Sequence, residues 1–142
     1  MQSVRMKHLI LVSSILFVLS GCGVKKEGGV RLANEMEDYA LDYIEKHEIL
    51  EPGESIVAYY DYTISLNGKE AAILTDERLI YHKREENTVI AHADVADVVH
   101  QEESLSGTTI EVYAADGQSM RIVIAPLNGG ETFYRALMNQ LE

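Results

Sequence analysis

Polar and apolar positions follow two different periods along this chain. From residue 31 to about residue 48, apolar side chains recur every three or four positions, which predicts an amphipathic helix. Acidic residues are enriched in its first turns, where they favour the helix dipole, and Pro52 with Gly53 ends the segment. We expect the apolar stripe to dock on the domain that follows; the alternative is a helix that binds a partner. The stripe consists of Leu32, Met36, Ala40, Tyr43, Ile44 and His47.

After Gly53 the apolar period shortens to two, which predicts a series of β-strands. Two dipeptides, Asn67-Gly68 and Asp116-Gly117, are typical of tight hairpin turns. Beyond Pro126 the period lengthens again, and apolar residues spaced by four predict a final helix that ends at Leu141. The predicted strands cover residues 56–66, 69–75, 78–84, 88–92, 95–102, 108–115 and 118–125.

Three segments of the β-rich region share a progression of strand and turn residues. They are residues 54–62, the run A-I-L-T-D-E-R-L-I-Y at 72–81, and the run V-A-D-V-V at 95–99. This progression resembles bacterial pleckstrin-homology (PH)-like domains. The resemblance implies an α+β, mainly β fold: a seven-stranded antiparallel, partly open barrel capped by the C-terminal helix. We therefore expect the amphipathic helix at 31–48 to precede a PH-like domain at 51–142.

The N-terminal segment has the three parts of an export signal. Basic residues precede an apolar run at 9–19, which is too short to span a bilayer, and small residues then lead to Cys22. The sequence Leu19-Ser20-Gly21-Cys22 resembles the lipobox of bacterial lipoproteins. That resemblance implies a signal peptide at 1–21, begun at Met1 or Met6, and acyl chains such as palmitate on Cys22. The alternative is an ordinary secretory signal in which the cysteine is incidental.

Cys22 is the only cysteine, so no disulfide can form within one chain and no thiol is left for catalysis. Residues 22–30 are short, polar and rich in glycine, and we expect them to form a flexible tether. The chain would then be held in the cell envelope, where a neighbouring envelope protein is the expected partner. Gly23 after the cysteine resembles lipoproteins directed to the outer membrane, facing the periplasm, in Gram-negative bacteria.

The charge balance excludes broad classes of partner. The chain carries a net charge of −11, and −13 without residues 1–21, which hold two basic residues and no acid. Such a surface repels nucleic acid and anionic lipid headgroups, so we expect neither as a partner. Lipid-binding PH domains place several Lys or Arg on the first hairpin, whereas this chain offers Lys69 alone. A phosphoinositide site is therefore not expected.

No motif of a known enzyme class is present, and we expect no catalytic residue, cofactor or metal. Three histidines, His82, His92 and His100, lie on consecutive predicted strands. If their registers aligned they would offer a zinc site with an open position, but their spacing matches no known ligand pattern.

Eight tyrosines and no tryptophan are the remaining feature of the composition. Tyr59 and Tyr113 fall opposite the main apolar faces of their strands, which makes them a candidate partner surface. The alternative is that the helix at 31–48 covers that sheet face. We therefore expect a membrane-anchored lipoprotein whose PH-like module mediates protein–protein interaction near the membrane; the alternative is small-ligand or lipid binding in the barrel mouth.

Overall fold

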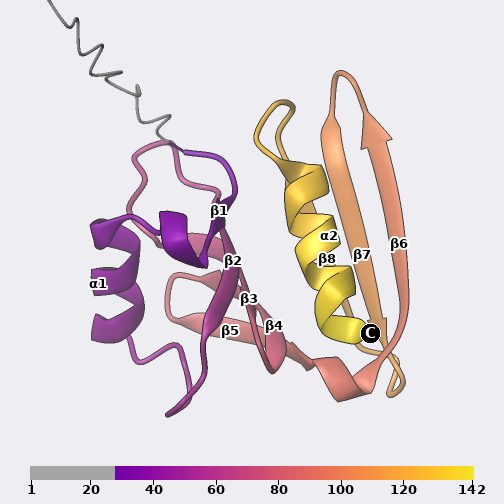
Figure 1. Cartoon of the computed structure of the whole chain (residues 1–142), viewed down its shortest axis with the longest axis horizontal. Coiled ribbons are helices and arrows are strands. Elements are labelled where there is room, and N and C mark those ends of the chain that lie inside the picture. Colours follow the sequence, from indigo (N-terminus) through magenta and orange to yellow (C-terminus); the bar gives the residue numbers. More distant parts are fainter. Residues whose placement is uncertain (1–27) are drawn as a thin grey trace, which may run out of the picture.

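The computed structural model describes residues 28–142, which form two antiparallel sheets and two α-helices (Figure 1). Five strands make one sheet, in the order β1-β2-β3-β4-β5, and three make the other, in the order β6-β7-β8. The predicted signal peptide at 1–21 and Cys22 lie outside the described residues. The elements are β1 (Arg31–Leu32), η1 (Ala33–Glu35), α1 (Asp38–Lys46), β2 (Ile56–Asp61), β3 (Glu70–Thr75), β4 (Arg78–Lys83), β5 (Glu86–Ala91), η2 (His92–Asp94), β6 (Val95–Glu103), β7 (Gly107–Ala114), β8 (Ser119–Ile124) and α2 (Gly130–Leu141).

The first hydrophobic core, here called the inner core, lies between the two sheets and α2. Alternate residues of both sheets point into it, as the period of two predicts. Phe133 on α2 is fully buried there, and Leu137 lies one turn further along the same helix face. The mainly β fold with a C-terminal helix packed on strands is therefore confirmed. The buried members are Ala58, Tyr60, Ala72, Leu74, Leu79, Ile90, Ile110, Val112, Ala114, Met120, Ile122, Ile124, Phe133, Ala136 and Leu137.

A second hydrophobic core, here called the outer core, lies on the other face of the five-stranded sheet. The helix α1 covers this face, and Ala40 and Ile44 are its buried contacts. The prediction that the N-terminal helix docks on the following domain is thereby confirmed for α1. The buried members are Ala40, Ile44, Ile49, Tyr59, Ala71, Ile73 and Ile80.

The N-terminal helix is shorter than predicted, because it begins at Asp38 and not at residue 31. Arg31 and Leu32 are extended and pair as β1 with the edge of β2. The single turn of η1 follows. The side chain of Glu35, at its end, accepts a hydrogen bond from the N–H of Leu32 at 3.1 Å. Pairing with β2 gives this backbone hydrogen-bond partners that the exposed first turn of a helix lacks.

The first predicted strand is also shorter, because the chain leaves the sheet after Asp61. The Asp61 carboxylate is buried and accepts hydrogen bonds from the N–H and the hydroxyl of Thr63, at 2.7 and 2.5 Å, and from the N–H of Gly68 at 2.8 Å. A buried carboxylate needs such donors. Residues 62–69 therefore form a loop around it in place of the predicted two-residue turn.

The remaining predicted strands lie within two residues of β3–β8. In the described part of the chain, each strand ladder stays within its own sheet. Two tyrosine side chains, one on β2 and one directly after it, link the five-stranded sheet to β8 and the residue that follows β8. The Tyr62 hydroxyl accepts the N–H of Val123 at 3.2 Å, and the Tyr60 hydroxyl accepts the N–H of Ala125 at 3.3 Å. These hydroxyls occupy backbone donors at the edge of the three-stranded sheet, which would otherwise be open to another strand.

Candidate interaction surface

The structure separates the two tyrosines that the sequence placed on one candidate surface. Tyr59 is 2% exposed and lies in the outer core beneath α1, so it is not part of an accessible surface. Its burial, together with the charge of Asp61, raises the pKa of Tyr59. Tyr113 is 38% exposed on β7, and its hydroxyl donates to Glu111 at 2.7 Å. The expectation for Tyr59 is corrected, because the helix covers the sheet face on which it lies.

The three histidines considered for zinc lie in three separate surroundings. His82 is buried, with Nδ1 2.7 Å from Asn87 Oδ1 and Nε2 3.1 Å from Tyr43 Oη. His100 stacks on a tyrosine of α2, and burial lowers the pKa of His92. Within residues 28–142, no group of three His, Cys, Asp or Glu side chains is placed to hold a metal ion.

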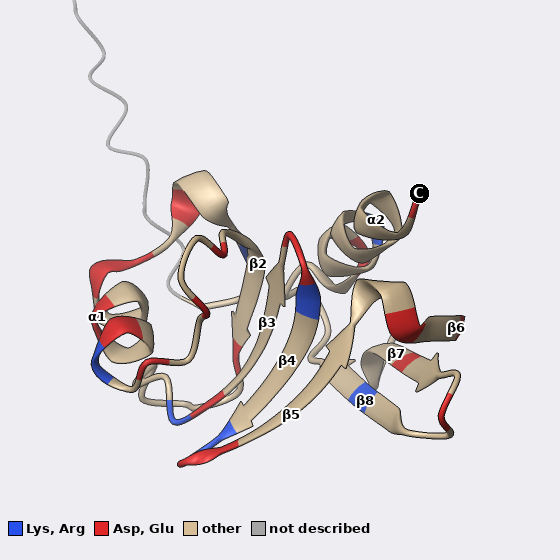
Figure 2. Cartoon of the chain, turned by 90° about the horizontal axis from the view of Figure 1, so that it is seen from below, with Lys and Arg blue, Asp and Glu red and all other residues tan. Residues whose placement is uncertain are grey.

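Acidic side chains gather on the layer that contains α1. Between residues 35 and 54 the sequence has eight Asp and Glu and one Lys, which gives this stretch a net charge of −7. That is more than half of the net charge of the chain, −11. Figure 2 shows these acidic positions along η1 and α1, on the opposite side of the molecule from β6–β8. The inner face of α1 is used by the outer core, so its acidic side chains face solvent.

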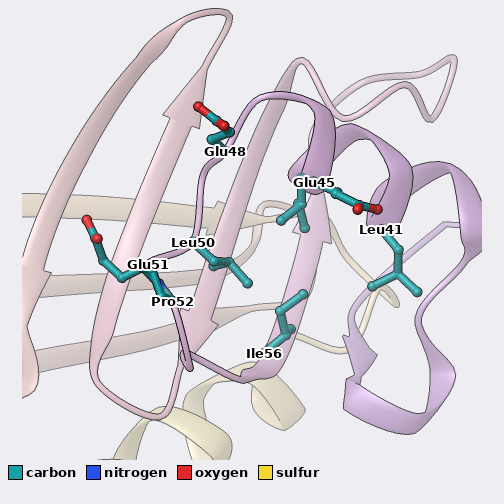
Figure 3. Close-up of a pocket in the computed structure, with 8 residues that line it drawn as sticks. Leu41, Glu45, Glu48, Leu50, Glu51, Pro52 and Ile56 are labelled. Atoms are coloured by element: carbon teal, nitrogen blue, oxygen red, sulfur yellow. The ribbon is translucent and has the colours of Figure 1, made fainter.

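A groove of about 750 Å³ runs between α1 and the segment that leads into β2 (Figure 3). Its apolar centre consists of Leu41, which is exposed, and Leu50 and Ile56, which are half-buried. Acidic side chains surround this centre. They belong to Glu45, Glu48 and Glu51. The groove therefore combines apolar contact area with a rim of carboxylates, of which that of Glu51 lies 3.9 Å from Arg78 Nη1.

A half-buried ion pair fixes the segment that forms one wall of the groove. Arg78 Nε lies 2.8 Å from Glu54 Oε1, its Nη2 lies 2.9 Å from Oε2, and Nη2 also donates to the Ile49 carbonyl at 3.2 Å. Burial alone would raise the pKa of Glu54, but hydrogen bonds from Arg78 and Thr75 hold it below its ordinary value. This two-point contact ties residues 49–54 to the turn between β3 and β4, so the wall is formed in advance of binding.

A second groove, of about 650 Å³, lies between the N-terminal segment, β2 and α2. Among the described residues that line it there is no carboxylate, and Arg135 is the one charged side chain. The two grooves share Ile56, which lies where β2 begins. The second groove is lined by Leu32, Ala33, Asn34, Ile56, Val57, Thr132, Arg135, Ala136, Asn139 and Gln140.

Sequence reasoning missed both grooves, because periodicity identifies the side of a helix or strand that is buried. One signal was available: Leu41 is a large aliphatic residue on the predicted polar side of an acidic helix. Leu50 and Ile56 flank Pro52-Gly53 in the sequence, and only the folded chain brings them beside Leu41.

We compared the chain with protein-family models, with curated proteins and with solved structures, and none of the three comparisons found a match. Among residues 28–142, neither α-helix has the length and apolar character needed to cross a bilayer.

Proposed function

We propose that this protein is a membrane-tethered interaction module that binds a neighbouring envelope protein through the groove beside α1. The partner segment is basic and amphipathic: its apolar face meets Leu41, Leu50 and Ile56, and its positive charges face the acidic rim. The observation that carries the proposal is this pairing of an apolar groove with an acidic border.

The acidic rim and the aliphatic centre of the groove contribute to binding in different ways. Exposed ion pairs contribute about 0–1 kcal/mol each, so the rim mainly steers the partner and rejects acidic competitors. Affinity comes from burying the aliphatic centre, at roughly 25 cal/mol per Å² of apolar area, less the cost of association. The fixed wall at residues 49–54 lowers that cost, because less of the site is ordered on binding.

The tether in this proposal is the segment at 22–30. It begins at Cys22, which is acylated after residues 1–21 are cleaved off. Two or more acyl chains give stable anchoring, whereas one chain binds a bilayer only marginally. The module is then held in the cell envelope, on the periplasmic face of the outer membrane if the cell is Gram-negative. We further propose that β2–β8 and α2 form a PH-like fold. The order of four strands, three strands and a C-terminal helix supports this, and β1 and α1 are additions to it.

A second candidate function is binding of a small ligand or lipid. The groove between β2 and α2 favours it, because its lining is mostly apolar with uncharged hydrogen-bonding groups from Asn34, Asn139 and Gln140.

Site-specific photocrosslinking in membranes tests the first candidate. A photoreactive amino acid is placed at Leu41 of the full chain, and the control position is Tyr113, which is also exposed but on β7. We expect a discrete crosslinked protein from position 41 and none from position 113. Glu45→Lys, Glu48→Lys and Glu51→Lys together should reduce its yield about tenfold at low salt.

The matched control for charge is Glu85→Lys, Glu86→Lys and Asp116→Lys, which makes the same change in net charge away from the groove. Equal loss with both triple variants would mean that overall charge, and not this groove, attracts the partner. A crosslink from position 113 alone would move the surface to the three-stranded sheet. No crosslink from either position would favour the ligand-binding function.

A further inference from the structure

Three large aliphatic side chains are almost fully exposed at the tips of three loops. Ile64 is 105% exposed, Leu105 is 96% exposed and Leu127 is 91% exposed. They lie in the β2–β3, β6–β7 and β8–α2 loops. Scattered apolar residues on a surface need no explanation, but a group of them at one place marks a binding site.

The three loops lie at one end of the molecule, side by side with the point where the N-terminal segment enters. A Cβ built on Gly28 would lie 3.7 Å from the Leu66 side chain, and the N–H of Val30 donates to the Asn128 carbonyl at 2.7 Å. Gly107, directly after the β6–β7 loop, lies against the backbone of residues 124–126. Figure 1 shows the same arrangement, with all three loops and the start of the coloured ribbon toward its upper end.

The tips of these loops carry no charge, although a quarter of the chain is charged; the β2–β3 loop ends at Lys69, whose carbonyl accepts the N–H of Arg84. Residues 28–30, 62–68, 104–110 and 122–130 contain no Asp, Glu, Lys or Arg. The nearest acids on the β6–β7 hairpin are Glu102 and Glu103, and the Ser106 hydroxyl donates to Glu103 at 2.5 Å. An uncharged apolar end is unlike the acidic layer around α1, so the two surfaces fit different partners.

We infer that this end of the molecule docks on a lipid surface of low net charge, with Ile64, Leu105 and Leu127 inserted among the headgroups. The inference rests on the proposed tether. Gly28 is six residues from Cys22, so even an extended chain places it within about 20 Å of the acylated cysteine. The tether therefore brings this end, and not the opposite one, to the membrane.

Charge decides the kind of lipid surface. A net charge of −13 for residues 22–142 is repelled by anionic headgroups, which leaves zwitterionic lipid as the favourable surface. Glu102 and Glu103 limit the depth of insertion, because carboxylates remain hydrated at the headgroup level. Docking of this kind fixes the orientation of the module, and it leaves the groove beside α1 open to a neighbouring membrane protein.

The chain has no tryptophan, so single substitutions give unique fluorescent reporters. The test uses full-chain protein purified from membranes and reconstituted in phosphatidylcholine vesicles with brominated acyl chains. The reporters are Ile64→Trp, Leu105→Trp and Leu127→Trp. The control is Tyr113→Trp, since Tyr113 pairs with Ser119 at the other end of the three-stranded sheet. We expect the three reporters to shift to shorter wavelength and to lose about half or more of their emission, while the control keeps both.

Equal quenching of reporters and control, in protein that floats with the vesicles, would overturn the docking inference and leave the tether standing. Protein that does not float with vesicles would overturn both the tether and the docking. A shift to shorter wavelength without quenching by brominated lipid would mean that protein covers this end. A second copy is the cover if the shift depends on protein concentration, and either result overturns lipid docking.

Discussion

The two sheets of this protein differ in how many of their faces are covered. The five-stranded sheet has the inner core on one face and α1 on the other, and five consecutive residues of β3 are buried. The three-stranded sheet is covered on one face, and β8 alternates strictly between exposed and buried residues. A strand covered on both faces becomes a continuous buried run, whereas a strand covered on one face keeps the alternation.

This difference explains the opposite outcomes for Tyr59 and Tyr113. Each side chain points away from the inner core of its own sheet. α1 lies over the face that holds Tyr59, and the face that holds Tyr113 is open together with Val99 and Val123. A tyrosine away from the inner core is therefore a surface residue on one sheet and a core residue on the other.

Removing a side chain from the inner core should have the largest effect. Phe133→Ala leaves a cavity where both sheets and α2 meet, and we expect it to lower the free energy of unfolding by about 3–5 kcal/mol. Ile44→Ala in the outer core should cost less, about 2–3 kcal/mol, because only α1 and one sheet face lose contacts. Chemical denaturation followed by circular dichroism measures both changes.

Hydrogen exchange sharpens the same prediction. With Ile44→Ala, amides of α1 should exchange faster while those of β7 and β8 remain protected. Faster exchange in all of these strands would show that the outer core is as essential as the inner one.

The tyrosine pair gives a matched test of coverage. Tyr59→Ala should destabilise the fold by about 2–4 kcal/mol, since it removes a buried ring beneath α1. Tyr113→Ala should change stability by about 0.5 kcal/mol or less, because the ring is exposed. Thermal unfolding of the two variants checks both numbers. Comparable losses would mean that the outer face of the three-stranded sheet is also covered, for example by a second copy.

Acid should weaken the polar interactions that stabilise the five-stranded sheet, and we expect this loss of stability to be the smallest of the predicted effects. The pKa of Glu54 is lower in the folded state than its ordinary value of 4.5, so its ion pair stabilises the fold above about pH 4.5. That stability is lost as the pH falls through the folded-state pKa. His92 acts in the same direction from about pH 6.5 downward, because burial lowers its pKa and the folded state resists its protonation.

Urea unfolding at a series of pH values checks this sign. Glu54→Gln should lower stability at neutral pH and flatten its decline between about pH 5 and 3. An unchanged slope in that range would assign the acid sensitivity to other carboxylates. Glu70 is one of these, because hydrogen bonds from Tyr81 and then Lys83 lower its pKa.

Several tyrosines have roles that no local pattern indicated. Tyr60 and Tyr62 each place a ring against the inner core and a hydroxyl on a backbone N–H at the edge of β8. Tyr43 reaches His82 and the Arg84 carbonyl from α1. A tyrosine joins an apolar body to a polar end, which suits positions where a core meets unpaired backbone.

The sequence alone determined the succession of strands β3–β8 along the chain, the C-terminal helix and the acidic character of residues 35–54. These follow from periodicity, turn residues and charge, which act between neighbours in the chain. Its errors lie where distant residues compete with local preference: β1 pairs with β2 and shortens the helix, and Asp61 gathers Thr63 and Gly68 and shortens the first strand.

Only the tertiary structure decided what lies over each face and which loops meet. A period of two indicates which side chains share a face of a sheet. Whether that face is covered depends on residues far away in the sequence, because α1 is what covers Tyr59. The groove beside α1 and the end with Ile64, Leu105 and Leu127 arise in the same way, because each joins residues from separate segments. Surfaces of this kind belong to the packed chain, since burial and exposure are properties of the whole fold.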